Sequence, residues 1–216
     1  MRILTGGCRQ SDGKIFLYSN EEAKAATEKD LEKFRQSMGS LIEDPALYGT
    51  LSGWDNLYLH GIVCGNTNKE CLRELLAIAG LDQTGSKKVK HFSLGMKQRL
   101  GIAKALVNRP NILILDEPIN GLDPMGIIEV RKLLKKINTE YNTTIIVSSH
   151  ILSELYQFAD EYIFIDHGKV VELIDHESLK NKIEEGHKSN SAASSESGTL
   201  EEYFVKLIGE RRETNV

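Results

Sequence analysis

The sequence predicts an α/β fold in which a parallel sheet carries an inserted helical subdomain. The prediction rests first on NILILDEP at residues 111–118, an aliphatic run of strand length that ends in two carboxylates. A helical pattern follows over 121–138, and a β-branched strand follows over 143–150. A strand, a helix and a second strand joined by short connections imply a parallel pair. The helical pattern of residues 45–105 supplies the insertion.

Composition restricts the class of protein. The 216 residues suffice for one domain with a sizeable core. The 27 basic and 31 acidic residues give a net charge of −4, which argues against a protein that mainly coats nucleic acid. The three cysteines form no C-x-x-C pair, so they fit a reducing cytoplasm better than a disulfide framework or a zinc knuckle. No apolar run approaches the ~20 residues of a membrane span, so we expect any membrane association to come through a partner.

The first 44 residues are interpreted as the remainder of an α/β core. The opening MRILTGG has the apolar spacing of a helix's last turns, with Gly6 and Gly7 suited to a C-terminal cap. A strand is predicted over 14–19, and residues 20–36 are a charged, helix-prone surface segment. From residue 40 onward the pattern becomes helical and leads into the subdomain.

The middle of the chain alternates helices with strands. Ser93 and Gly95 stand where a helix begins, and that helix leads into the acidic strand. The next helix has Asp123 as its predicted cap and Pro124 at its first position. The β-branched strand after it ends in His150. The apolar residues that the two helices should bury are Met96, Leu100, Ala103, Val107, Ile127, Val130, Leu134 and Ile137.

The last part of the chain contains a hairpin and an extension. An antiparallel hairpin is predicted over 162–173 with its turn at Asp166-His167-Gly168, and it completes the core segment 106–175. The extension, 176–216, holds a Ser-rich linker at 187–198. It ends in an amphipathic helix with a capping box of Thr199 and Glu202 and with the apolar residues Leu200, Phe204, Leu207 and Ile208.

The acidic strand end requires a positive partner. Asp116, Glu117 and His150 fall at the carboxyl ends of parallel strands, where α/β proteins bind their ligands. The cation usually bound at such a strand end is Mg²⁺, which bridges the phosphates of a nucleotide. The phosphate loop G-x-x-x-x-G-K-[ST] is not in the sequence. Its nearest approach, GCRQSDGK at residues 7–14, has five residues between the glycines and is followed by Ile15 in place of a hydroxyl.

Each of these signals has a plain structural alternative. An acidic pair such as Asp116 and Glu117 is as typical of a sheet edge or a helix cap as of a metal site. A lone histidine such as His150 is more often structural. Ser93 fits an ordinary helix N-cap, and Asp123 fits an ordinary helix start. The order and spacing of the four motifs, rather than any one of them, favour a functional site.

In this order the motifs resemble the nucleotide-binding subunits of ATP-binding-cassette (ABC) transporters, over residues 1 to about 171. The run FSLGMKQRLGIAKALVNRPNILILDEPINGLDP carries most of the resemblance. It implies a P-loop NTPase-like parallel sheet core with an inserted helical signature subdomain. The matches are the signature motif at residues 92–96, the Walker B carboxylates Asp116 and Glu117, the D-loop at residues 121–123 and the switch histidine His150.

Two departures from the family pattern indicate a particular branch of the family. Glu43 falls where the family has its Q-loop glutamine, and FSLGM replaces the commoner LSGGQ. Together they resemble the branch that exports, or confers resistance to, bacitracin-like and lantibiotic-like peptides. Because Glu43 is charged, it need not perform the role of the Q-loop glutamine, although the carboxylate of Glu43 could still reach the coordination shell of a metal.

The resemblance implies ATP and Mg²⁺ as cofactors and a role for each matched residue. Asp116 would hold the Mg²⁺ shell, and Glu117 would orient and deprotonate the attacking water. His150 would steady the γ-phosphate from the opposite side. Ser93 and the backbone N–H of Gly95 would bind a phosphate oxygen of nucleotide held by another subunit.

The resemblance also implies partners. Asp123 would communicate across the interface with a second nucleotide-binding subunit, in a homodimer or a heterodimer. A transmembrane permease would hold the chain at the cytoplasmic face of the cell membrane, and no nucleic acid is implied. Residues 48–54 are a candidate coupling surface for a permease helix, although Trp54 is better interpreted as subdomain core.

The missing phosphate loop leaves several interpretations. In this family a helix whose end reads like MRILTG follows the loop at once, so we expect an N-terminally incomplete ABC ATPase that is an enzyme only when the missing part is supplied. The alternative is a partner chain that hydrolyses nothing and donates its signature motif and D-loop in trans. A chromosome-handling ABC protein is disfavoured because no heptad run occurs. An inactive relic of a disrupted gene is a further alternative.

Overall fold

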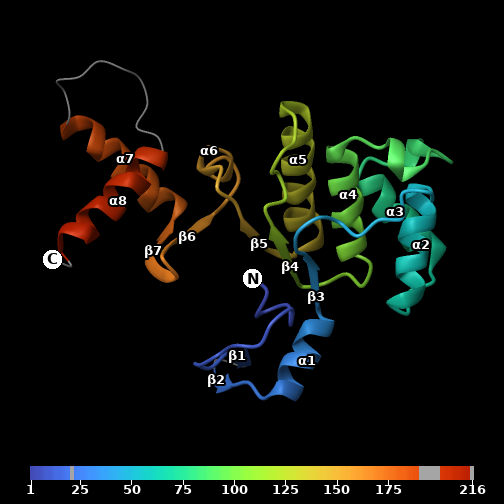
Figure 1. The fold of residues 1–216 in the computed structure, drawn as a ribbon, viewed down its shortest axis with the longest axis horizontal. Coiled ribbons are helices and arrows are strands. Elements are labelled where there is room, and N and C mark those ends of the chain that lie inside the picture. The colour runs from blue at the N-terminus through green and yellow to red at the C-terminus, as the bar shows by residue number, and fades with distance from the viewer. Residues whose placement is uncertain (20–21, 190–199, 215–216) are drawn as a thin grey trace. The chain divides into compact units, whose positions relative to one another are not determined.

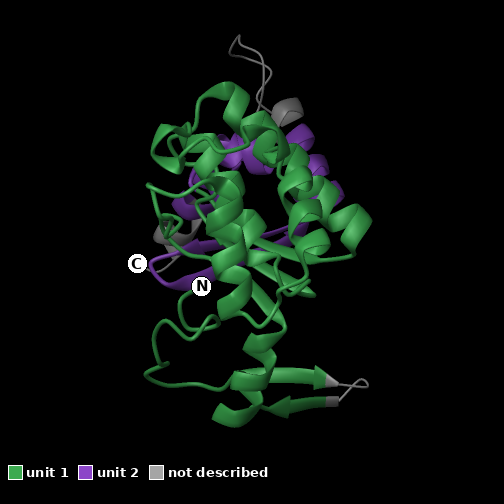
Figure 2. Ribbon diagram, turned by 90° about the vertical axis from the view of Figure 1, so that its right-hand side faces the viewer, with its two compact units in different colours: residues 1–149 green, residues 150–216 purple. Residues whose placement is uncertain are grey.

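A computed structural model describes residues 1–19, 22–189 and 200–214 (Figure 1). The chain divides into two compact units, Met1–Ser149 and His150–Val216, which are coloured separately in Figure 2. The finer four-part division suggested by the sequence stays a prediction.

The first unit is built on a parallel sheet, which confirms the predicted α/β fold. Its strands are β3 (Met38–Leu41), β4 (Ile112–Asp116) and β5 (Thr144–Ser148), in the order β3-β4-β5. The helix α5 (Pro124–Tyr141) connects β4 to β5, as the strand–helix–strand pattern predicted. β4 is the central strand and carries three fully buried aliphatic side chains, while β3 and β5 form the edges of the sheet among the described residues.

β3 is a strand that the sequence did not predict. The sequence predicts a helical pattern from residue 40 onward, but Ser40 and Leu41 pair in parallel with Ile114 and Leu115. Gly39 explains the position of the strand, because a Cβ at this residue would lie 2.2 Å from the carbonyl oxygen of Ala105. The strand therefore passes so close to the end of a helix that only glycine fits there.

The N-terminal residues differ from the prediction in two places. Residues 2–6 form turns rather than a helix, although Gly6 has the left-handed φ of +83° expected for a helix-terminating glycine. Within the charged segment, β2 (Glu22–Ala25) pairs antiparallel with β1 (Phe16–Ser19), so this part is a strand and not helix. The rest is helical as predicted, in α1 (Glu28–Gln36).

The helical insertion is confirmed. It contains α2 (Gly53–Val63), α3 (Lys69–Ile78), α4 (Leu94–Ala105) and the short 3-10 turns Asp82–Thr84 and Val89–His91. α4 runs beside α5 (Figure 1). Trp54, interpreted from the sequence as subdomain core, is half-buried and stacks on Tyr58 with ring centroids 5.7 Å apart, so it lies at the margin of that core.

The second unit packs two long helices on a hairpin. The predicted hairpin is present as β6 (Glu161–Asp166) and β7 (Lys169–Asp175), and it is preceded by α6 (Leu152–Leu155). The sequence did not predict α7 (His176–Ser189), which includes the start of the expected Ser-rich linker. The remaining linker residues and Thr199 lie outside the described residues. α8 (Leu200–Thr214) confirms the terminal helix, and the core of the unit consists of Tyr162, Phe164, Ile174, Leu179 and Leu200.

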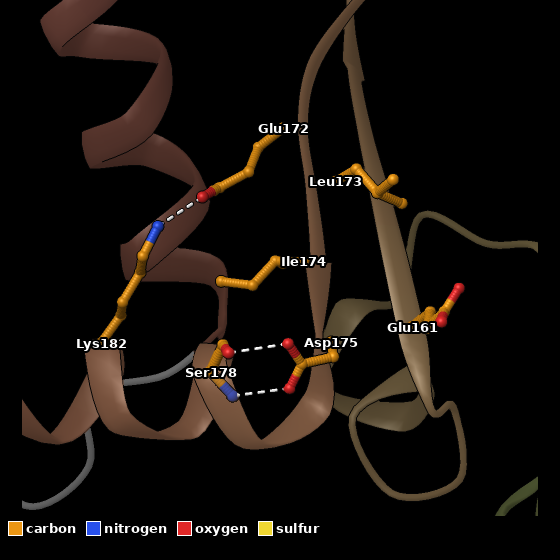
Figure 3. Close-up of a pocket in the computed structure, with 7 residues that line it drawn as sticks. All are labelled: Glu161, Glu172, Leu173, Ile174, Asp175, Ser178 and Lys182. Atoms are coloured by element: carbon orange, nitrogen blue, oxygen red, sulfur yellow. Dashed lines mark hydrogen bonds and ion pairs between the residues drawn. The ribbon is translucent and has the colours of Figure 1, made fainter.

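A polar cluster joins three elements of this unit. Glu172 on β7 accepts hydrogen bonds from Lys182 on α7 and, at 2.6 Å, from the hydroxyl of Tyr203 on α8. Figure 3 shows the side chain of Lys182 pointing to Glu172, with a dashed line marking their hydrogen bond. Both residues line a pocket of about 390 Å³. Burial raises the pKa of Glu172, but the hydrogen bonds from Lys182 and Tyr203 outweigh it and leave the pKa below its ordinary value.

We expect this cluster to make the second unit sensitive to acid. Because the folded pKa of Glu172 is lowered, its stabilising contribution is complete above its ordinary pKa of 4.5 and is lost as the pH falls through the folded value. The protection factors of the α8 amides, which correct the exchange rates for the slower intrinsic exchange in acid, should therefore fall below about pH 4.5. Glu172→Gln should weaken this pH dependence, whereas the exposed Glu161→Gln should leave it intact. An identical pH dependence in Glu172→Gln and in the wild type would refute the assignment.

Candidate functional site

The site lies at the carboxyl edge of the parallel sheet. Because β3, β4 and β5 run in parallel, the residues that follow them meet at one edge. Asp116 is the last residue of β4 and pairs in register with Ser148, the last residue of β5. Glu117 follows Asp116 directly, and Glu43 comes shortly after the end of β3. The structure thus brings the predicted carboxylates to one edge of the first unit.

Asp116 is held in place by its neighbour on β5. The hydroxyl of Ser148 donates a hydrogen bond of 2.5 Å to Oδ1 of Asp116. The carboxylate is half-buried, so this bond fixes the orientation of a group that still reaches solvent. Sequence reasoning missed Ser148, since serine at a strand end has no distinctive spacing and its role depends on the register of the sheet.

Glu117 has a strained backbone. Its φ is +49°, a left-handed conformation that costs a non-glycine residue roughly 1–3 kcal/mol. Two hydrogen bonds offset this cost, because its N–H lies 3.1 Å from both the carbonyl oxygen and the hydroxyl of Ser148. Strain of this kind is concentrated at functional sites, where the surrounding structure enforces an otherwise unfavourable conformation.

Glu43 lies at the same edge, but its side chain interacts with Arg2. Its φ is +64°, and its carboxylate forms an ion pair with Arg2. The two side chains are 64% and 62% exposed, so the pair contributes at most about 1 kcal/mol and exchanges easily. The proposed place of Glu43 near a metal shell stays a prediction.

The two predicted helix caps are confirmed. Ser93 precedes α4, and its hydroxyl accepts a hydrogen bond of 3.2 Å from the N–H of Met96. Asp123 precedes α5, and its carboxylate accepts a hydrogen bond of 3.0 Å from the N–H of Gly126. Gly95 is buried in the first turn of α4, whereas Ser93 is exposed. An exposed hydroxyl beside the N–H groups of a helix start can receive an anion.

His150 follows β5 closely in the chain, as the sequence predicted, and is the first residue of the second unit. Its side chain is exposed. Its role as a switch histidine stays a prediction.

The residues of this site fit Mg²⁺ better than they fit the phosphates of ATP. Residues 7–14 lie in turns and extended chain ahead of β1, not between a strand and a helix, so they form no phosphate loop. The described residues contain no cluster of three or more His, Cys, Asp or Glu side chains that could hold a metal. Mg²⁺ usually takes one or two carboxylates and completes its shell with phosphates and water. Asp116 fits that limited role, whereas residues 7–14 do not fit the role of a phosphate loop for ATP.

No helix among the described residues has the length and apolar composition needed to cross a bilayer.

A parallel sheet with carboxylates at its carboxyl edge and capped helix starts defines an α/β protein of the kind that binds its ligands at the carboxyl ends of the strands. The family model described as ABC transporter matches residues 1–120, and the chain belongs to this family. It is 41% identical over 182 residues to the bacitracin transport ATP-binding protein BcrA of Bacillus licheniformis, a match that covers 84% of this chain and 58% of that protein. It is 44% identical over 171 residues to the lantibiotic transport ATP-binding protein SrtF of Streptococcus pyogenes, covering 79% and 70%.

Solved structures agree with the fold. CbiO1 of Clostridium perfringens, described as part of an ABC transporter complex, superimposes with a TM-score of 0.72 at 27% identity, over 88% of this chain and 77% of that one. The ATP-binding cassette MJ0796, in a dimeric post-hydrolysis state bound to ADP and Pi, gives a TM-score of 0.65 at 25% identity, over 81% and 78%.

Proposed function

We propose that this chain is an ATP-binding subunit of an ABC transporter that exports, or confers resistance to, peptide antibiotics. The observation that carries the proposal is the carboxyl edge of the sheet, where Ser148 fixes the Asp116 carboxylate and the backbone of Glu117. The names of the bacitracin and lantibiotic relatives support the substrate class. A transmembrane permease would hold the chain at the cytoplasmic face of the membrane.

The proposed chemistry assigns one task to each predicted site residue. Asp116, already oriented by Ser148, would supply a carboxylate to Mg²⁺, which neutralises charge on the phosphate oxygens. Glu117 would accept a proton from the attacking water, and its fixed backbone limits the positions that its carboxylate can take. His150 would donate a hydrogen bond toward the terminal phosphate. Glu43 would join the metal shell only after leaving Arg2.

The second half of the site would act across a dimer. Ser93 and the N–H of Gly95 would bind a phosphate of nucleotide that a second nucleotide-binding subunit holds. Asp123 already caps α5, so its contact across the interface would use the carboxylate oxygen left free by Gly126 or replace that bond. These residues would supply only part of the phosphate contacts, because the sequence has no phosphate loop.

That absence supports a second candidate function. A chain without a phosphate loop could still lend Ser93, Gly95 and Asp123 to a complete partner while hydrolysing nothing itself. Each charge-assisted phosphate contact contributes about 1.5–3 kcal/mol, so the purified chain alone should bind ATP weakly under either candidate.

Ser93→Ala tests the role shared by both candidates. We expect it to lower ATP turnover by the membrane assembly, recovered from native cells through an affinity tag, by roughly 10-fold to 100-fold. The matched control is Thr27→Ala, which removes an exposed hydroxyl cap of another helix, α1. Equal losses in the two variants would mean that only helix stability changed, and the signature role of Ser93 would be rejected.

A further inference from the structure

The first turns of α4 and α5 are connected by a close backbone approach and by an ion pair. A Cβ added at Gly95 would lie 3.3 Å from the Cα of Gly126, so the two helices approach backbone to backbone. About one turn further along, Arg99 of α4 forms an ion pair of 3.0 Å with Glu129 of α5. Arg99 is itself held in place, because it also donates a hydrogen bond of 2.6 Å to the carbonyl oxygen of Ala79. The two helix starts therefore form one rigid pair.

Leu94 extends this contact to the loop before α5. Its Cδ2 lies 3.4 Å from the position that a Cβ on Gly121 would take, so this methyl group lies beside Gly121. Gly121 has a left-handed φ of +71°. Leu94 is 46% exposed.

We propose that Leu94 is a positioning residue that holds the Gly121 turn against the start of α4. In this arrangement Asp123 and Ser93 move together when a phosphate binds at the signature motif, residues 92–96. The proposal rests on the proposed function. It concerns a position where this chain departs from the commoner signature LSGGQ, in which glycine offers no side chain to cover the turn.

Hydrogen exchange of the chain alone tests the contact. The amides of Asn120 and Leu122 report on the loop, because they donate to the carbonyl oxygens of Glu117 and Ile119 at 3.2 and 3.3 Å. Leu94→Ala should accelerate their exchange several-fold and leave the interior of α4 unchanged. Leu94→Met, which keeps the volume, should restore it. The matched control is Leu59→Ala on α2, a leucine that is 41% exposed.

Turnover by the membrane assembly tests the functional consequence. Leu94→Ala should lower kcat for ATP several-fold with little change in KM, and Leu94→Met should recover kcat. Unchanged exchange of Asn120 and Leu122, or equal acceleration in Leu59→Ala, would overturn the contact. Faster exchange without a change in kcat would overturn the positioning role. The hydrogen-exchange measurement needs no ATP, so it tests the contact independently of the proposed function. If the wild-type membrane assembly hydrolyses no ATP, that result counts against the proposed function and does not affect the contact.

Discussion

Replacing Glu117 with glutamine should reduce ATP turnover by the membrane assembly by roughly 10²–10⁴-fold, the usual contribution of a general base. The amide keeps the size of the side chain and, through the backbone, the hydrogen bonds to Ser148, but it cannot accept the proton of the attacking water. Phosphate release at saturating ATP is the measurement. Glu140→Gln serves as the control, because Glu140 lies on the exposed face of α5 in a surface ion pair with Lys136.

This variant also separates the two candidate functions. If the chain completes its own hydrolytic site, both Glu117→Gln and Ser93→Ala lower turnover. If it only donates its signature motif and D-loop in trans, Ser93→Ala lowers turnover and Glu117→Gln does not. Normal turnover in both variants would exclude both functions.

Leu113→Ala should destabilise the first unit by about 2–5 kcal/mol. Leu113 is completely buried on the central strand, where it pairs with Gly39 of β3 and Ile145 of β5, so the cavity left by the substitution cannot fill easily. Trp54, the single tryptophan, lies in this unit, and its fluorescence follows unfolding in urea.

The same substitution at an exposed leucine provides the comparison. Leu59→Ala removes the same atoms from a side chain that is 41% exposed, on a helix where alanine is well tolerated. A loss of stability at Leu113 no larger than that at Leu59 would contradict the assignment of β4 as the centre of the core.

The elements that sequence patterns predicted well are those with strong local signals. β4 and β5 are uniform aliphatic or β-branched runs, and α4 and α5 each have a capping residue and a regular apolar repeat. β3 has neither, because its four residues, MGSL, are placed by the close approach of Gly39 to Ala105. β2 is similar, since EAKA favours a helix locally and becomes a strand by pairing with β1.

The same division applies to the site. Motif spacing placed Asp116, Glu117, Ser93 and Asp123 correctly at strand and helix ends, because these positions depend on local structure. Ser148 and the ion pair between Glu43 and Arg2 depend on which segments the fold brings together. No local pattern could have predicted them.

The outer edge of β5 has a consequence for strand pairing. Among the described residues this strand is hydrogen-bonded only to β4, and its sequence, TIIVS, has no charge, proline or glycine. Natural edge strands are usually protected by lysine, proline or a bulge, and uncharged β-branched segments without them recruit strands from other molecules. Within the first unit, this edge of β5 therefore offers its unpaired backbone N–H and C=O groups to a further strand.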